Sequence, residues 1–371
     1  MAPLSRRIEF SDEQAMLLET AVGFCREKSP IRAVRDLLGS ESGFDRAVWD
    51  DMVGLGWSGI AIPERHGGSG LTLAEAATIA EPMGRHLLAT PYLSTQIAVQ
   101  ALLHASAAQQ AATLPLIAQG AIATAAVFEA DGDWDLTRIT ATATITGATA
   151  CLAGEKTLVI DAGVADIVLA SVMLDGAPSL AILGRPDPAR LRPETIIDET
   201  RRSARLDLTG IEIPATCLIT DAAAFIAIRD AALLFASAEA AGGIAGVLDI
   251  IVDYLNTRST FGRKIGSYQA LKHGCADILI GLERSRSHLY HAATLCAGNE
   301  GPEIALRMAK TEATDNFAHA GDRAVQFHGG FGFTWECDAQ LFLRRALWLQ
   351  YFHGDSAHHR TRLAPLLLDT V

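Results

Sequence analysis

Aromatic side chains and positive charge are both scarce in this sequence. Phe, Trp and Tyr together make up only 6% of its 371 residues, a composition that suits close-packed helices better than a β-sandwich. The formal net charge is −12, so a surface that binds nucleic acid is not expected. An anionic small molecule would instead need a local cluster of donors. With 49% hydrophobic residues, the chain can bury a core spread over two or three domains.

Cysteine pairs are missing as well. The six cysteines are scattered without any CxxC or Cys/His spacing, so neither a structural zinc site nor a disulfide framework is expected. Reduced, buried thiols are the prediction for Cys25, Cys151, Cys217, Cys275, Cys296 and Cys337.

The sequence also lacks a secretion signal and an uninterrupted membrane span. The N-terminal segment MAPLSRRIEFSDEQ has no apolar run after its arginines, unlike a signal peptide. The longest apolar stretch, near residues 231–252, contains Glu239 and Asp249 and is better explained as a buried helix. We therefore expect a cytoplasmic protein without membrane insertion.

Helical and strand periodicities occupy separate parts of the chain. Apolar residues follow a helical period up to about residue 119, with a glycine-rich break at residues 62–70. Residues 137–150 alternate threonine with apolar or small residues, which is the period of a strand. Further strands are predicted at ADIVLASVM, SLAILG and RLDLTGIEI, with turns at GEK, DGAPS and RPDP. After Pro214 the helical period returns.

This order predicts an α+β protein that is mainly α and has three domains. They are a helical domain over residues 1–119, a β domain over 120–219 and a helical bundle over 220–371. Strands and helices do not alternate, and no P-loop or GxGxxG follows a strand, which argues against a βαβ nucleotide-binding fold.

One distinctive segment, YLNTRSTFGRKIGSYQ, covers residues 254–269. Arg258 stands at a predicted helix end beside Phe261 and Gly262, where its guanidinium could offer a fork of donors to a pyrophosphate. The alternative is a helix cap, in which cations lie near the last carbonyls and glycine ends the helix.

A second distinctive segment, QFHGGFGFTWE, covers residues 326–336. The paired Gly329 and Gly330 would let a ligand or a second chain approach the backbone closely. The alternative is again a helix terminator, accompanied by aromatic packing.

Together with GLGWSGIAIPERHGGSG at residues 54–70, these segments resemble the acyl-CoA dehydrogenase family in order and spacing. The resemblance implies an N-terminal helical domain, a central β-barrel domain and a C-terminal four-helix bundle that oligomerises. It also implies FAD as cofactor, an acyl-CoA thioester as substrate for α,β-desaturation, and an electron-transfer flavoprotein as acceptor. The family residues that bind the ADP half of FAD correspond to Arg258, Phe261, Gly262, Gln269, Gln326, Gly329 and Gly330.

The catalytic base of the family is missing from this sequence. Family members abstract the α-proton with a glutamate, commonly in a Tyr-Glu-Gly context, and counting from the glycine pair places His353 there, with Arg344 on the family's usual arginine. Some members carry the glutamate on the helix before RxxFG, and that position is Ala232. Glu239 lies about two turns further along and is interpreted as a polar partner inside the bundle.

The segments that line the flavin ring in this family also differ. Where the family has Thr-Glu-Pro, this chain has Phe128-Glu129-Ala130, and the Trp-Ile-Thr of the family is Leu158-Val159-Ile160. Leucine cannot replace an indole face, and isoleucine has no hydroxyl to donate. The chain therefore resembles the subunit without a catalytic glutamate in bacterial heterotetrameric acyl-CoA dehydrogenases of steroid degradation. Such a subunit would complete a flavin site whose ring and base lie in a paralogue.

Two alternatives remain at this point. The chain could be a self-contained flavin enzyme, monooxygenase- or oxidase-like, that uses His353 as base, or a scaffold subunit that binds no nucleotide. Because His358 and His359 are adjacent and point apart on a helix, they do not converge with His353 on a metal, so no metal site is predicted.

Overall fold

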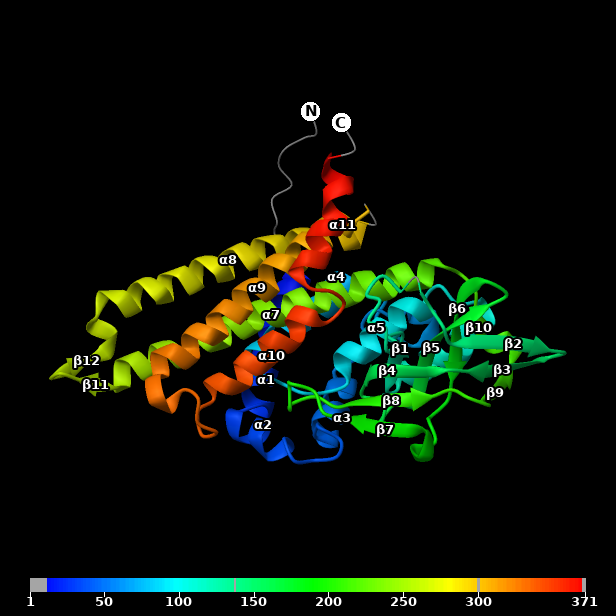
Figure 1. The fold of residues 1–371 in the computed structure, drawn as a ribbon, viewed down its shortest axis with the longest axis horizontal. Helices are drawn as coiled ribbons and strands as arrows, with labels where there is room; N and C mark the ends of the chain where they lie inside the picture. Colours follow the sequence, from blue (N-terminus) through cyan, green and yellow to red (C-terminus); the bar gives the residue numbers. More distant parts are fainter. Residues whose placement is uncertain (1–11, 137, 299–300, 369–371) are drawn as a thin grey trace. The chain divides into compact units, whose positions relative to one another are not determined.

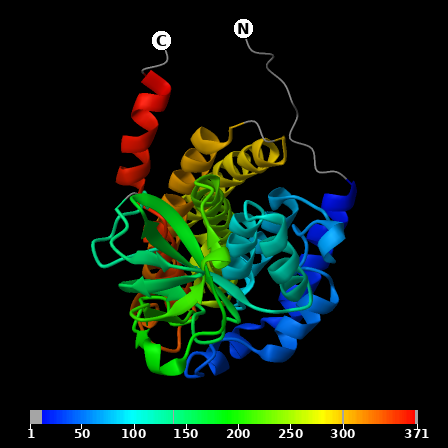
Figure 2. The ribbon, with the colours of Figure 1, turned by 90° about the vertical axis from the view of Figure 1, so that its right-hand side faces the viewer.

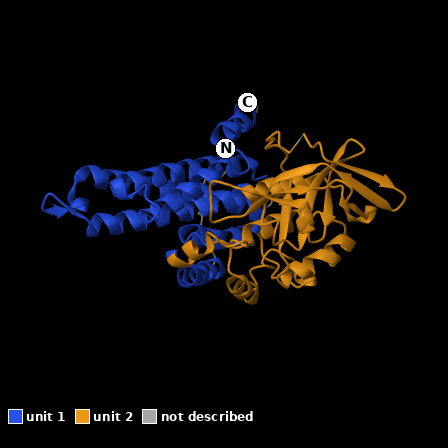
Figure 3. Ribbon diagram, turned by 60° about the horizontal axis from the view of Figure 1, so that its bottom comes forward, with its two compact units in different colours: residues 1–31, 73–88, 233–371 blue, residues 32–72, 89–232 orange. Residues whose placement is uncertain are grey.

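A computed structural model describes residues 12–136, 138–298 and 301–368. The chain divides into two compact units (Figure 3). Unit 1 contains residues 1–31, 73–88 and 233–371, and unit 2 contains residues 32–72 and 89–232. Each unit therefore combines segments that are distant in sequence, and the three contiguous domains named above stay a prediction.

Unit 1 is helical. Its elements are α1 (Asp12–Lys28), α4 (Leu73–Arg85), the part of α7 (Ala223–Thr257) from residue 233 on, α8 (Gln269–Gly298), α9 (Glu303–His328), α10 (Ala339–Tyr351) and α11 (Ser356–Leu368). A small hairpin of β11 (Ser259–Thr260) and β12 (Arg263–Lys264), followed by η4 (Ile265–Ser267), connects α7 to α8, and η5 (Gly329–Phe331) follows α9 (Figure 1).

Small residues let α7 pack closely inside unit 1. A side chain at Gly242 would place its Cβ 1.8 Å from the Glu81 carbonyl oxygen of α4, and one at Gly243 would lie 2.2 Å from the Phe317 ring of α9. By length and composition α7 could span a membrane, but 94% of its most apolar window is buried inside the protein. The predicted buried helix is confirmed.

Unit 2 contains shorter helices and the strands. The helices are α2 (Ile31–Leu37), α3 (Arg46–Gly54), η1 (Glu64–His66), α5 (Tyr92–Leu102), α6 (Ala107–Ala118), η2 (Pro188–Arg190) and η3 (Ala215–Cys217). The strands are β1 (Ala123–Ala126), β2 (Thr142–Thr146), β3 (Thr149–Ala153), β4 (Glu155–Ile160), β5 (Ile167–Leu174), β6 (Ala177–Leu183), β7 (Leu191–Glu194), β8 (Ser203–Asp207), β9 (Glu212–Pro214) and β10 (Leu218–Ile219).

The strands of unit 2 form two curled sheets (Figure 2). The larger follows the order β10-β6-β5-β2-β3-β9, with β1 pairing in parallel with β5, and the smaller follows the order β4-β8-β7. The buried strand β5 reads IVLASVML, the apolar run expected where both faces of a strand are covered. The predicted combination of helical parts with a central curled β part is confirmed.

The glycine-rich break at residues 62–70 has a packing reason within unit 2. A Cβ at Gly68 would lie 2.1 Å from the Ile62 carbonyl oxygen and 2.5 Å from that of Gly59. Only glycine allows the chain to fold back on itself this closely.

Three local predictions differ from the structure. The strand predicted over 137–150 is a hairpin of β2 and β3 whose turn contains Gly147, at φ 64°; residue 137 lies outside the described residues. The predicted turn GEK is wrong, because β4 begins at Glu155 and only Gly154 has a positive φ. All six cysteines are free, as predicted, but only Cys25 and Cys337 are buried.

Candidate functional site

The RxxFG segment folds as a tight hairpin at the end of α7. The Arg258 N–H donates to the Tyr254 carbonyl at 2.9 Å, and β11 then pairs with β12 in antiparallel register. The two residues between the strands, Phe261 and Gly262, have φ angles of 53° and 79°, the pattern of a type I′ turn. The turn projects the Phe261 ring into solvent, with 91% of the residue exposed.

The paired glycines end α9. Gly329 caps the helix with φ 62° and ψ −140°, a conformation that essentially only glycine adopts. A side chain added at Gly329 or Gly330 would meet no atom within 4 Å. The helix-terminator interpretation is therefore correct, and the backbone beside it is also open to a ligand.

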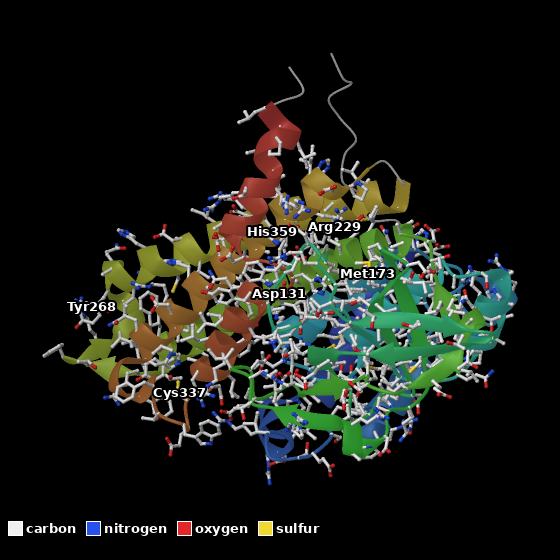
Figure 4. The ribbon with its side chains drawn as sticks, turned by 45° about the vertical axis from the view of Figure 1, so that its right-hand side comes forward. Asp131, Met173, Arg229, Tyr268, Cys337 and His359 are labelled. Carbon is white, nitrogen blue, oxygen red and sulfur yellow. The ribbon has the colours of Figure 1, made fainter. Side chains whose placement is uncertain are left out.

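Unit 1 brings these two segments together. The Tyr254 ring, one turn before Arg258, stacks on the His328 ring with their centroids 4.3 Å apart. Gly274 of α8 lies against the Phe327 ring, where an added Cβ would come within 2.5 Å of it. Figure 4 labels Tyr268, which precedes Gln269, at this end of the bundle. Three chain segments that are separate in sequence therefore meet where the predicted ligand contacts lie.

The polar side chains at this end are available for a ligand. Arg258, Gln269 and Gln326 are exposed, and within the described parts of the chain no hydrogen bond or ion pair engages their side chains. The neighbouring cations are occupied locally: Arg263 stacks over the Tyr268 ring at 4.0 Å, and the Lys264 ammonium donates to the Thr257 carbonyl at 2.7 Å. An uncommitted guanidinium beside open glycine backbone suits a phosphate-bearing group, so these residues fit the ADP half of FAD.

His353, at the position of the family base, lies in the turn between α10 and α11. It is buried and has φ 56°. Burial, together with the nearby charge of Lys310, lowers the pKa of His353 to about 3. A group with so low a pKa is a weak base near neutral pH.

Lys310 closes this turn from α9. Its fully buried ammonium donates to the Gly354 carbonyl at 2.9 Å and to the Gln350 carbonyl at 3.3 Å. Burial lowers the pKa of Lys310 to about 7, although Asp315 and Asp355 act in the opposite direction. The Lys310 ammonium is thus engaged by two backbone carbonyls of the turn, whereas the buried Nδ1 of His353 makes no hydrogen bond among the described residues.

The other charged or histidine positions do not supply a base or a metal site. Ala232, the alternative base position, is fully buried. Glu239 forms an ion pair with Arg345, and both are fully buried, as the sequence predicted for a polar partner inside the bundle. The Arg307 guanidinium donates to His359 Nδ1 at 3.2 Å, and burial lowers the pKa of His359 to about 2. Among the described residues, no group of three His, Cys, Asp or Glu side chains could hold a metal ion.

The segment of unit 2 that corresponds to the ring contacts is closed by its own hydrogen bonds. The Glu129 carboxylate accepts from the Lys156 ammonium at 2.6 Å and from the Thr140 and Ala141 N–H groups. Burial would raise the pKa of Glu129, but these hydrogen bonds hold it at about 2. Lys156 also donates to the Ser171 hydroxyl at 2.7 Å. The Lys156 ammonium is fully buried and directed at Glu129 and Ser171 rather than at solvent.

Leu158 keeps an unusual backbone at the position of the family's tryptophan. Its φ is 52°, it is 45% exposed, and a bulge in the β4–β8 register surrounds it. Glu194 accepts from the Leu158 N–H at 2.8 Å and from the Thr157 hydroxyl at 2.7 Å. Glu194 thus holds the backbone of this bulge, but the Leu158 side chain could offer a flavin ring only an apolar contact.

Sequence reasoning missed two features of the site. The stack of Tyr254 on His328 had no signal in the spacing of the motifs. Lys310 did have one, because Leu306, Lys310 and Phe317 share the buried face of α9, and a lysine on an apolar helical face needs acceptors inside the core.

Comparisons with known proteins agree with this geometry. Models described as the acyl-CoA dehydrogenase N-terminal and C-terminal domains match residues 11–121 and 234–368. The chain is 31% identical to acyl-CoA dehydrogenase IpdE2 of Mycobacterium tuberculosis, over 90% of this chain and 91% of that protein.

Solved structures give the same result. A subunit of a Tcur3481–Tcur3483 steroid ACAD variant superposes with a TM-score of 0.88 at 26% identity, covering 97% of this chain and 98% of that one. The ChsE4–ChsE5 complex of Mycobacterium tuberculosis shares the fold, with a TM-score of 0.88 at 22% identity over 98% of this chain and all of that one. The chain therefore belongs to the acyl-CoA dehydrogenase family, whose members are FAD-dependent oxidoreductases that act on CH–CH bonds.

Proposed function

We propose that this chain is the non-catalytic subunit of a hetero-oligomeric acyl-CoA dehydrogenase. It binds the ADP half of a FAD molecule whose ring is bound by a paralogous subunit. The same paralogue supplies the catalytic carboxylate. The observation that carries the proposal is the contrast between an open set of donors around Arg258 and a closed, buried turn at His353. The two-component names of the Tcur3481–Tcur3483 and ChsE4–ChsE5 proteins support a paralogous partner.

Each residue of the ADP site has a defined task. Arg258 supplies a charge-assisted hydrogen bond to the pyrophosphate, and the open backbone at Gly329 and Gly330 lets the nucleotide approach. Gln269 and Gln326 add neutral donors and acceptors. FAD held by these residues would supply a hydride acceptor for the β-carbon of the acyl thioester. The α-proton is taken by a carboxylate of the paralogue, because neither His353 nor Ala232 can take it.

The substrate of the complex is an acyl-CoA, and the steroid ACAD among the similar structures favours a steroid-derived acyl group. Electrons then pass to an electron-transfer flavoprotein in the cytoplasm. His353 as an independent base is disfavoured by its burial and its low pKa.

Flavin content tests the proposal directly. The chain is purified alone and together with a co-expressed paralogous acyl-CoA dehydrogenase subunit, and bound FAD is counted by absorbance. We expect little flavin alone and about one FAD per two chains in the pair. One flavin per chain in the isolated protein, bleached by an acyl-CoA, would refute the proposal.

The substitution Arg258→Ala separates flavin binding from scaffolding. In the pair it should weaken FAD binding by about 10- to 100-fold, the loss expected for a hydrogen bond to a charged group. Arg46→Ala is the matched control, because Arg46 is exposed and pairs only with Asp50 in α3. If Arg258→Ala leaves the flavin content unchanged, the chain is a scaffold.

A further inference from the structure

The proposed ADP site is assembled from the ends of two helices that are distant in sequence. Only non-covalent packing fixes the distance between these ends. Arg258 follows α7, and Gln326, Gly329 and Gly330 end α9, so the affinity for a nucleotide depends on how the ends of these two helices are held together. The contacts at these ends are therefore the place to look for residues that act without touching the ligand.

A cluster of three aromatic rings joins the two helix ends. Tyr254 of α7 stacks on His328 of α9 at 4.3 Å, with 29° between the ring planes. On the glycine side, the Phe331 ring lies 6.5 Å from Tyr254 and 6.4 Å from His328. The Tyr254 hydroxyl also donates to the His328 carbonyl, at a long 3.4 Å. Each ring is one helical turn or less from a residue of the proposed ADP site.

The His328 ring of this cluster is itself fixed. His328 is buried, and its Nδ1 lies 2.7 Å from the Ala324 carbonyl oxygen one turn earlier in α9. A carbonyl oxygen only accepts, so Nδ1 carries a proton and donates to it, which fixes the ring plane. Tyr254 thus packs against a ring whose orientation is determined by α9. The stack therefore fixes the end of α7 relative to the end of α9.

We propose that Tyr254 is a positioning residue for the ADP site: by stacking on His328 it holds Arg258 at the distance from Gly329 and Gly330 that the nucleotide requires. This inference rests on the function proposed above and adds a residue that does not touch FAD. The ring carries the effect, because the 3.4 Å hydroxyl contact is at the long limit of a hydrogen bond.

The test is a titration of the full chain, in complex with its paralogue and stripped of flavin, with FAD and separately with ADP. Tyr254→Leu should weaken both ligands by about tenfold, the loss of one aromatic pair. Tyr254→Phe keeps the ring and should bind within about twofold of wild type. At saturating FAD, turnover by the Tyr254→Leu pair should return to the wild-type value, because the reacting groups are untouched.

Two further variants separate positioning from general destabilisation. Tyr290→Leu removes a tyrosine of α8 that donates to Glu81 at 2.7 Å, about 30 Å along the helix from Gln269 at 1.5 Å per residue. It should lower the melting temperature and leave FAD affinity unchanged. Phe331→Leu changes a ring that is 45% exposed, so it will fold, and it should weaken FAD by about two- to threefold.

The outcomes distinguish the two proposals. If Arg258→Ala weakens FAD but Tyr254→Leu and Phe331→Leu do not, the positioning role is wrong and the proposed function stands. If Arg258→Ala also has no effect, the ADP site itself is wrong. A Tyr254→Phe variant as weak as Tyr254→Leu would overturn the assignment to the ring.

Discussion

The helix ends around Arg258 and the turn around His353 belong to the same helical unit and treat polar groups in opposite ways. At the helix ends the donors are exposed and uncommitted, and the backbone is open. At the turn, Lys310 is committed to two carbonyls and His353 is buried beside it. The proposed ligand site therefore keeps its donors in solvent, where a phosphate can reach them, whereas the polar groups of the turn are buried and closed to a ligand.

The largest effect is expected from breaking a buried pair that serves only stability. Replacing Glu239 by Leu leaves the Arg345 guanidinium buried without this carboxylate, which costs about 3–5 kcal/mol of unfolding free energy. Urea denaturation of the full chain measures the loss. The double variant Glu239→Leu/Arg345→Met should recover most of it, and neither variant should change FAD binding. A loss below about 1 kcal/mol would contradict the structural role.

The substitution His353→Glu tests whether a carboxylate in the closed turn makes the chain a dehydrogenase by itself. His353→Glu restores the carboxylate type used by the family, but we expect the chain without a paralogue to remain without dehydrogenase activity. The reason lies in unit 2, where Leu158 and Ile160 offer no polar contact to a flavin ring. Anaerobic bleaching of added FAD by acyl-CoA is the measurement. Substantial bleaching would show that the turn around His353 can be made catalytic by a single carboxylate, contrary to its assignment as a structural site.

The lowered pKa of Lys310 predicts that the folding stability of the chain depends on pH. Its pKa in the folded chain is about 7, below the ordinary 10.5, so the unfolded chain binds more protons between these values. Stability from this group therefore rises as pH increases from about 7 to 10 and is lost as pH falls through 7. Lys310→Met should remove this rise. Melting temperatures of both proteins across that range provide the check, and parallel curves would show that Lys310 does not titrate there.

The smallest effect concerns the strained bulge in unit 2. A leucine at φ 52° stores about 1 kcal/mol of backbone strain, so Leu158→Gly should stabilise the chain by up to that amount. Leu158→Ala keeps a Cβ and should bring no gain. Equal unfolding midpoints for the glycine and alanine variants would show that Glu194 does not hold a strained conformation.

The sequence predicted well what depends on local pattern. The buried α7 followed from its composition, and the end of α9 followed from Gly329, because positive φ angles select glycine. Gly262 does not end α7, which stops at Thr257; it lies in the turn between β11 and β12. The prediction of a turn at GEK was wrong because of tertiary contacts. Lys156 is buried in strand β4, where its ammonium donates to Glu129 and Ser171, and a charged residue can continue a buried strand when such partners are present.

The stack of Tyr254 on His328 could not be predicted for a different reason. The two residues are 74 positions apart, and neither motif states which helix faces the other. Packing of α7 against α9 decides it, through contacts such as Gly243 under the Phe317 ring. The residues proposed to contact FAD were suggested by their motifs, while Tyr254, proposed to position them, could be found only in the folded chain.

The exposed Phe261 has an energetic consequence for assembly. Its ring stands on the tip of a hairpin with 91% of the residue in water, and fully burying a side chain of this kind contributes about 1.5–3 kcal/mol. Within the proposed pair, a paralogue surface that covered this tip would therefore gain up to that amount of binding free energy.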